Sequence, residues 1–139
     1  MVDAAKVYLV GAGLGDPDLL TRKAERMLGF AGAVIYDSKV SAQILALANV
    51  TARCVAVGSE SSHEEHSAEV CGWYLRLRES CSCVVRLTST DPLLDGEFTE
   101  ELEFLARHGF ETEVIPGVLP ETVYECRAAM REARKAVAL

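Results

Sequence analysis

The sequence lacks an apolar run of the roughly 20 residues that a membrane-spanning helix needs. Its first six residues also lack the basic segment, apolar segment and cleavage site of an export signal. These two absences favour a soluble, cytoplasmic protein that neither crosses nor binds a membrane.

Basic residues are too few for a general nucleic-acid surface. The chain has 14 Lys and Arg against 21 Asp and Glu, which gives a formal net charge of −7, and neutralising phosphates requires Lys and Arg in clustered excess. The five cysteines are an odd number and have no Cys-x-x-Cys spacing, so we expect reduced thiols and no disulfide framework. Small molecules or proteins are the partners that remain.

The most informative feature that is present is a glycine-rich segment, Gly11-Ala12-Gly13-Leu14-Gly15-Asp16-Pro17, directly after a strand-like run at 6–10. Three glycines in five residues let the backbone approach a bound molecule closely and adopt positive φ. Asp16 and Pro17 suit the N-cap and the first residue of a helix expected over 17–30. A ligand site is therefore predicted at this loop.

A dinucleotide-binding fingerprint is an alternative interpretation of the loop, because Asp37 lies about twenty residues further on, at the end of a second apolar run. The fingerprint requires a third glycine where this chain has Asp16, whose charge would face a pyrophosphate at the helix N-terminus. A P-loop is excluded, since no Lys-Ser or Lys-Thr pair follows the glycines. The loop favours a ligand without phosphates, and a nicotinamide-binding domain ranks last.

Short apolar runs alternate with helix-like segments along the chain, without an internal repeat. The patterns predict strands at 6–10, 33–36, 54–57, 83–87 and 113–115, and helices at 17–30, 41–48, 64–79, 98–108 and 120–139. This alternation predicts the α/β class, with one three-layer domain around a mainly parallel five-stranded sheet.

Ligands of such sheets bind beyond the carboxyl ends of the strands. The site is therefore expected at the one edge that gathers the glycine loop, Asp37, Gly58, the loop around Asp91 and Pro116-Gly117.

Several motifs in the same order resemble a known family. They are Val7 to Pro17, Tyr36-Asp37, Val85-Arg86-Leu87 with Asp91-Pro92, and Val114-Ile115-Pro116-Gly117. Together they resemble the tetrapyrrole methylases, and within them the uroporphyrinogen-III C-methyltransferase branch, over nearly the whole chain. The resemblance implies the N-terminal α/β domain of class III S-adenosylmethionine-dependent methyltransferases at 1–119, a C-terminal helix at 120–139, and the absence of the family's second domain.

The resemblance also implies a site. The methyl donor would be S-adenosylmethionine, the acceptor a uroporphyrinogen-like tetrapyrrole, and Asp37 the catalytic proton acceptor. No metal is implied. A homodimer, or a partner that supplies the missing domain, would complete the cleft. The donor-binding positions that it implies are Gly13, Leu14, Ser89, Thr90, Asp91 and Leu94.

The chain departs from the family's pattern at four functional positions. Ser59 stands where the family has a lysine assigned as proton donor, and a serine hydroxyl cannot replace an ammonium as a general acid near neutral pH. Ser89 and Thr90 replace glycines, and Glu97 replaces an arginine that would favour an acidic substrate. These changes support a second hypothesis, a non-catalytic binding or assembly module descended from this fold, so enzyme status stays open.

Structural interpretations stand beside the functional ones. Asp37 and Asp91 could simply cap loops or turns. His63 and His66 lack the spacing of a zincin pair, which favours a solvated helix start over a metal site. The last helix is basic and amphipathic, and we expect it to pack on the sheet or against a docking partner.

Overall fold

The computed structural model describes residues 5–58, 63–89 and 98–138. One sheet runs through these ranges in the order β3-β2-β4-β1-β5, and every pairing is parallel. All strands therefore present their carboxyl ends at one edge, which confirms the predicted α/β domain with a five-stranded sheet. The strands are β1 (Lys6–Gly11), β2 (Ala33–Asp37), β3 (Arg53–Val57), β4 (Cys83–Thr88) and β5 (Glu111–Ile115).

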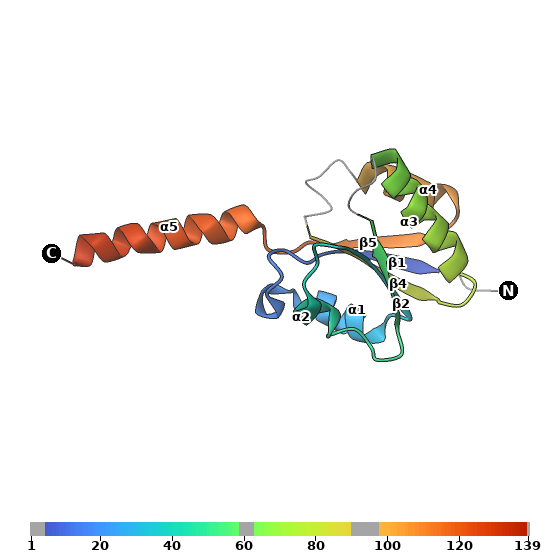
Figure 1. Ribbon diagram of the computed structural model, residues 1–139, viewed down its shortest axis with the longest axis horizontal. Helices are drawn as coiled ribbons and strands as arrows, with labels where there is room; N and C mark the ends of the chain where they lie inside the picture. The colour runs from blue at the N-terminus through green and yellow to red at the C-terminus, as the bar shows by residue number, and fades with distance from the viewer. Residues whose placement is uncertain (1–4, 59–62, 90–97, 139) are drawn as a thin grey trace.

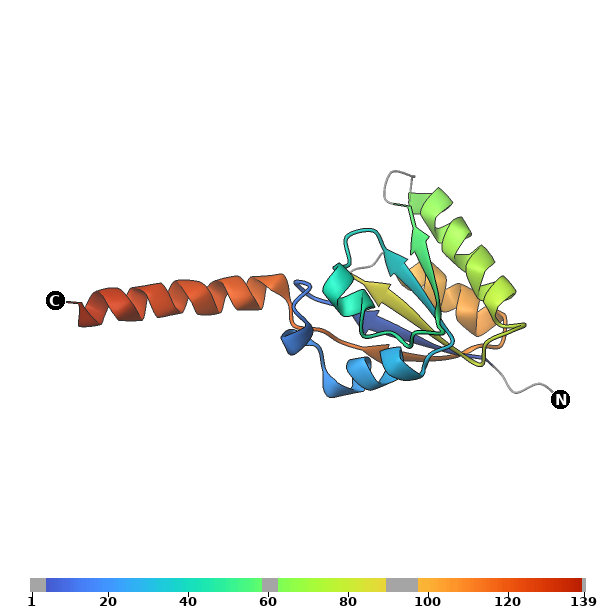
Figure 2. The same ribbon diagram turned by 60° about the horizontal axis from the view of Figure 1, so that its bottom comes forward.

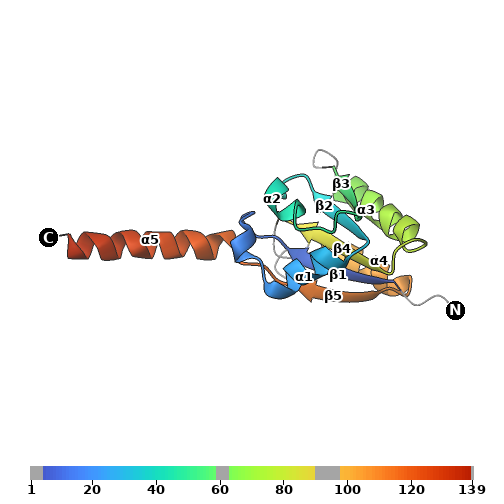
Figure 3. The ribbon, with the colours of Figure 1, turned by 90° about the horizontal axis from the view of Figure 1, so that it is seen from below.

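Helices cover both faces of the sheet and make three layers (Figure 1, Figure 3). The 3-10 turn η1 (Pro17–Leu19), α1 (Arg22–Phe30) and α2 (Ala42–Leu45) lie on one face, and α3 (His63–Leu77) and α4 (Thr99–Arg107) lie on the other. Side chains alternate along each strand, so each face has its own hydrophobic cluster. On the α3–α4 face it includes Val7, Leu9, Ile35, Val84, Tyr74 and Leu105, and on the other face Val10, Val34, Val85, Leu87, Leu28 and Ile44.

The expectation of a single helix over 17–30 is wrong, because two capping residues divide this segment. Asp16 caps η1, accepting a hydrogen bond from the Asp18 backbone N–H at 2.9 Å. Leu20 and Thr21 are then extended, and the Thr21 hydroxyl caps α1 by accepting from the Ala24 N–H at 3.1 Å. A second good N-cap inside an apolar stretch thus starts a second helix. The helix expected over 41–48 is only the short α2, with the predicted cap at Ser41.

The last helix, α5 (Pro120–Val137), extends away from the rest of the domain in every view (Figure 2). Its side chains from 124 to 137 are exposed, including Tyr124, Met130 and Val137. Of the two expected positions, packing on the sheet is therefore wrong, and docking against a partner stays a prediction. The chain passes the glycine loop after β5 and continues beyond the carboxyl edge, so the helix does not return over the sheet. Among the described residues no helix is long and apolar enough to cross a bilayer.

Candidate functional site

The glycine loop leaves the sheet at the carboxyl end of β1 and is held in place from two sides. The Ala12 N–H donates to the Thr88 carbonyl at 2.7 Å, which ties the loop to the end of β4. The Ser41 hydroxyl donates to the Gly15 carbonyl at 2.8 Å, which ties it to the start of α2. Gly13 and Gly15 have φ of 61° and 92°, the left-handed region that glycine adopts without a steric penalty.

The same loop packs backbone against backbone on the segment that follows β5. A Cβ atom on Gly13 would lie 2.6 Å from the Val118 carbonyl oxygen, and one on Gly117 would lie 2.4 Å from the Gly11 carbonyl oxygen. The close approach that the glycines permit is therefore, in part, an approach of two chain segments to each other. This contact fixes the outline of the carboxyl edge between β1 and β5.

The structure brings some of the predicted donor-binding residues to this edge. Gly11 and Thr88, the last residues of β1 and β4, pair with each other. Gly13 and Leu14 therefore follow the end of β1 next to Ser89, which follows the end of β4. Leu14 is 37% exposed and Ser89 is half-buried. The other predicted or altered positions lie outside the described residues: Thr90, Asp91, Leu94, Ser59 and Glu97.

Asp37 ends β2 and faces a buried arginine on the neighbouring strand. The alternation of β2 and β4 places Asp37 and Arg86 on the same face of the sheet, where Arg86 Nη2 lies 2.9 Å from Asp37 Oδ1. The Arg86 side chain is fully buried and that of Asp37 is 21% exposed. The contact is an ion pair without hydrogen-bond geometry, so Oδ1 is buried with no hydrogen-bond donor among the described residues.

A buried glutamate holds Arg86 from the α3–α4 side, and a buried tyrosine holds that glutamate. Arg86 Nε donates to Glu101 Oε1 at 3.1 Å, and the Tyr74 hydroxyl donates to the same oxygen at 2.7 Å. Burial would lower the pKa of the Arg86 guanidinium, but the charge of Glu101, followed by Tyr74 and Asp37, raises it above its usual range. Arg86 is therefore a permanent cation in the core. Burial, and then the charge of Glu101, raises the pKa of Tyr74 well above normal.

His66, in the first turn of α3, completes this cluster at the sheet edge. Its Nδ1 lies 2.8 Å from the Gly58 carbonyl oxygen, and its Nε2 lies 3.4 Å from Arg86 Nη2 and 3.7 Å from Asp37 Oδ1. The imidazole is therefore engaged with the end of β3 and with two charged side chains, which corrects its interpretation as part of a solvated helix start. In the described part of the chain, no group of three or more His, Cys, Asp or Glu could hold a metal ion.

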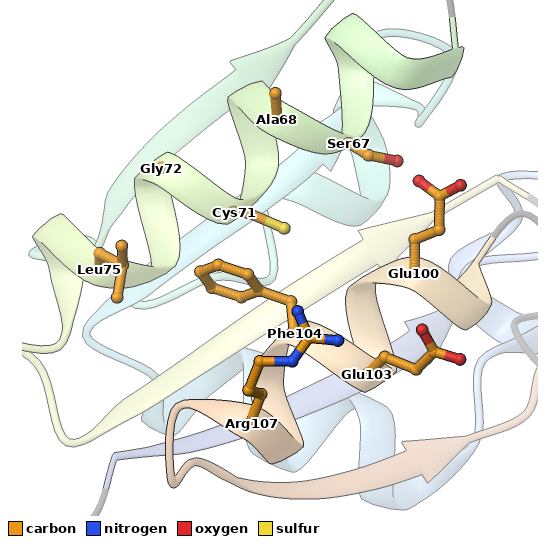
Figure 4. A pocket seen from close by; sticks show the side chains of 9 residues that line it. All are labelled: Ser67, Ala68, Cys71, Gly72, Leu75, Glu100, Glu103, Phe104 and Arg107. Carbon is orange, nitrogen blue, oxygen red and sulfur yellow. The ribbon is translucent and has the colours of Figure 1, made fainter.

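A separate groove lies on the outer side of α3 and α4 (Figure 4). It has a volume of about 600 Å³, and the glycine loop does not line it. Cys71 and Phe104 point into it from the two helices, with Glu103 and Arg107 along one side. The groove is open and carries no residue of the Asp37 cluster.

The thiol of Cys71 in this groove should react slowly. Burial, and then the charges of Glu101 and Glu100, raise its pKa to about 11, so only about one Cys71 in a thousand is a thiolate at about pH 8. Iodoacetamide should therefore label the exposed Cys54 and Cys126 at least about tenfold faster. Peptide mass mapping over time measures this, and equal labelling rates at Cys71 and Cys126 would contradict it.

Known proteins match this chain over most of its length. The sequence model of the tetrapyrrole (corrin/porphyrin) methylases matches residues 6–122. A uroporphyrinogen-III C-methyltransferase of Synechocystis sp. is 43% identical over 114 residues, which are 81% of this chain and 43% of that protein. The chloroplastic S-adenosyl-L-methionine-dependent uroporphyrinogen III methyltransferase of Arabidopsis thaliana is 42% identical over 81% of this chain and 31% of its own length.

A solved structure agrees with these relatives. The crystal structure of uroporphyrin-III C-methyltransferase from Thermus thermophilus, complexed with S-adenosyl homocysteine, superposes with a TM-score of 0.69 and 44% identity over 83% of this chain and 46% of that chain. This chain thus spans less than half the length of these three proteins. Identity above 40% and a family match over residues 6–122 together show that it belongs to the tetrapyrrole methylase family, as the motifs predicted.

Proposed function

We propose that this chain binds S-adenosylmethionine and takes part in C-methylation of a uroporphyrinogen-like tetrapyrrole. The observation that carries the proposal is its 44% identity to the Thermus thermophilus enzyme whose structure holds S-adenosyl homocysteine, the molecule that S-adenosylmethionine becomes after giving up its methyl group. Because the chain covers 46% of that enzyme, we further propose that the rest of the cleft comes from a longer chain or from another subunit, with a homodimer as one form.

The carboxyl edge supports a donor without phosphates. The Asp16 carboxylate occupies the N-terminus of η1, where it accepts from the Asp18 N–H. A pyrophosphate would meet this negative charge in place of free N–H groups. We assign donor binding to Gly13, Leu14 and Ser89 among the described residues, and to Thr90, Asp91 and Leu94 outside them.

Asp37 is the residue that we assign to proton transfer. The bound donor would supply a methyl group on a sulfonium: an acceptor carbon would attack that methyl, the bond from sulfur to the methyl would break with S-adenosylhomocysteine as the leaving group, and the methylated ring would then lose a proton to regain conjugation. Asp37 Oδ1 has free acceptor capacity, since no hydrogen bond from the described residues reaches it. Its contact with Arg86 holds the carboxylate at the end of β2, where it can accept that proton.

Isothermal titration of the full chain with S-adenosylmethionine tests donor binding. We expect a dissociation constant in the micromolar range. At about 100 times that concentration the ligand should raise the free energy of unfolding by about 2.7 kcal/mol. NAD serves as the control ligand and should produce neither heat nor a thermal shift. Absence of both signals with millimolar S-adenosylmethionine would refute the proposal, and a response to NAD alone would favour a nicotinamide site.

The alternative function is a non-catalytic binding or assembly module. Its support is the exposed apolar surface of α5, where Tyr124 and Met130 are 59% and 56% exposed, together with the replaced functional positions such as Ser59 and Glu97. It predicts no response to S-adenosylmethionine and concentration-dependent self-association in analytical ultracentrifugation. A monomer that binds the methyl donor would rule it out.

A further inference from the structure

The contacts of His66 define where its ring carries hydrogen. Nδ1 lies 2.8 Å from the Gly58 carbonyl oxygen, which can only accept a hydrogen bond. Nε2 lies 3.4 Å from Arg86 Nη2, and a guanidinium can only donate. Both contacts require the same neutral form, with the hydrogen on Nδ1 and the lone pair on Nε2. Two independent neighbours thus select one tautomer.

Beside Arg86 Nη2, the nearest charged atom to Nε2 is the buried oxygen of Asp37. The two atoms lie 3.7 Å apart, and Oδ1 receives no hydrogen bond from the described residues. A carboxylate oxygen and this ring nitrogen are both acceptors, so they do not bond each other directly; Arg86 Nη2 lies against both, 2.9 Å from Oδ1 and 3.4 Å from Nε2. A proton on Oδ1 would change this, because a small side-chain rotation brings the two atoms to hydrogen-bond distance, as happens when a catalytic site fills.

We propose that His66 acts through Asp37: it receives from Asp37 the proton that methyl transfer releases. The inference rests on the proposed function. In the first step an O–H bond forms at Asp37 Oδ1 as the methylated ring loses its proton. In the second that bond breaks and an N–H bond forms at Nε2, which restores the carboxylate. The imidazolium, whose side chain is 24% exposed, then gives the proton to water, so each methyl transferred releases one proton and no electrons are exchanged.

The charges around His66 suit a transient imidazolium. Asp37 on β2 attracts it, and so does Glu69 on α3, whose carboxylate accepts from the Gly58 N–H at 3.4 Å. Arg86 on β4 repels it, but the charge of Arg86 is already balanced by Glu101 on α4.

The tautomer is testable in the full chain without any ligand. Nitrogen NMR of the ¹⁵N-histidine-labelled protein, at a pH where the imidazole ring is neutral, should show the His66 hydrogen on Nδ1. The His66→Gln variant identifies the His66 signals, because they disappear from its spectrum. Asp37→Asn should shift the His66 Nε2 signal. His108 is the matched control, because its Nδ1 also lies 2.9 Å from a carbonyl oxygen, that of Phe104, outside the Asp37 cluster. The proposal would be overturned if the His66 hydrogen were on Nε2, or if the His66 nitrogen signals did not change in Asp37→Asn.

The relay is testable by methyl transfer from labelled S-adenosylmethionine. His66→Ala should lower kcat about 10- to 100-fold with little change in KM, and added imidazole should restore much of the loss. Glu103→Gln, at an exposed position on α4 outside the cluster, should show neither the loss nor the rescue. If the wild-type chain is active, and the His66→Ala variant either keeps its full kcat or is not rescued by imidazole, the relay alone is overturned. A wild-type chain that neither binds nor uses the methyl donor overturns the proposed function and the relay together.

Discussion

Replacing Glu101 with alanine should lower the free energy of unfolding by about 3–5 kcal/mol, the usual cost of breaking a buried ion pair from one side. Arg86 is fully buried, and Glu101 accepts hydrogen bonds from both Arg86 Nε and the Tyr74 hydroxyl. The variant leaves a buried cation with Asp37 as its one charged partner among the described residues, beside the neutral Leu87 carbonyl and His66 ring, and a buried hydroxyl without its acceptor. Denaturant unfolding monitored by circular dichroism measures the change.

Glu103→Ala is the matched control, because Glu103 is exposed on the same helix and lies outside the cluster. It should change stability by no more than about 0.5 kcal/mol. A double variant, Arg86→Met with Glu101→Leu, removes both charges and should recover the part of the loss that comes from the unpaired cation, since apolar residues of similar size often replace a buried pair without cost. The Tyr74 hydroxyl still lacks its acceptor in this variant. A loss below about 1 kcal/mol in Glu101→Ala would show that Arg86 does not depend on Glu101.

The strands and their carboxyl edge could be predicted because the signal lies within each segment. Buried parallel strands read as continuous apolar runs, such as Val34-Ile35 and Val84-Val85, and the glycine loop marks the edge where they end. Arg86 interrupts such a run, and no ion pair was predicted for it. Its partner Glu101 could not be chosen from sequence, because only the packing of α4 on the sheet brings the two together.

The structure differs from the sequence-based expectations at positions whose surroundings depend on tertiary contacts. His66 looked like one of several polar residues at a helix start, and only the adjacency of β2 and β4 places Asp37 and Arg86 beside its ring. The amphipathic pattern of α5 correctly predicted a helix but not its position, because a pattern of apolar residues does not specify the surface that covers them. Periodicity therefore located the elements, and long-range contacts determined the site.

The second large effect is expected from Gly117→Ala, at the junction of the glycine loop and the segment after β5. The added Cβ would lie 2.4 Å from the Gly11 carbonyl oxygen and 2.9 Å from its carbon. These are backbone atoms that pair with β4 through the sheet register, so they cannot rotate away as a side chain would. We expect a loss of about 2–4 kcal/mol in the free energy of unfolding, and weaker binding of S-adenosylmethionine if the donor occupies this edge.

Gly72→Ala is the control and should have the opposite sign. Gly72 lies inside α3, and apart from its chain neighbours and the backbone of its own helix no atom of the described residues lies within 4 Å of the position that a Cβ would take. Alanine in a helix interior is about 0.5–1 kcal/mol more favourable than glycine. The same denaturant unfolding, with calorimetry for the ligand, measures both variants. If Gly117→Ala were as stable as Gly72→Ala, the loop could move apart freely and the backbone contact would not define the carboxyl edge. A stable Gly117→Ala that also binds the methyl donor normally would place the donor away from this junction.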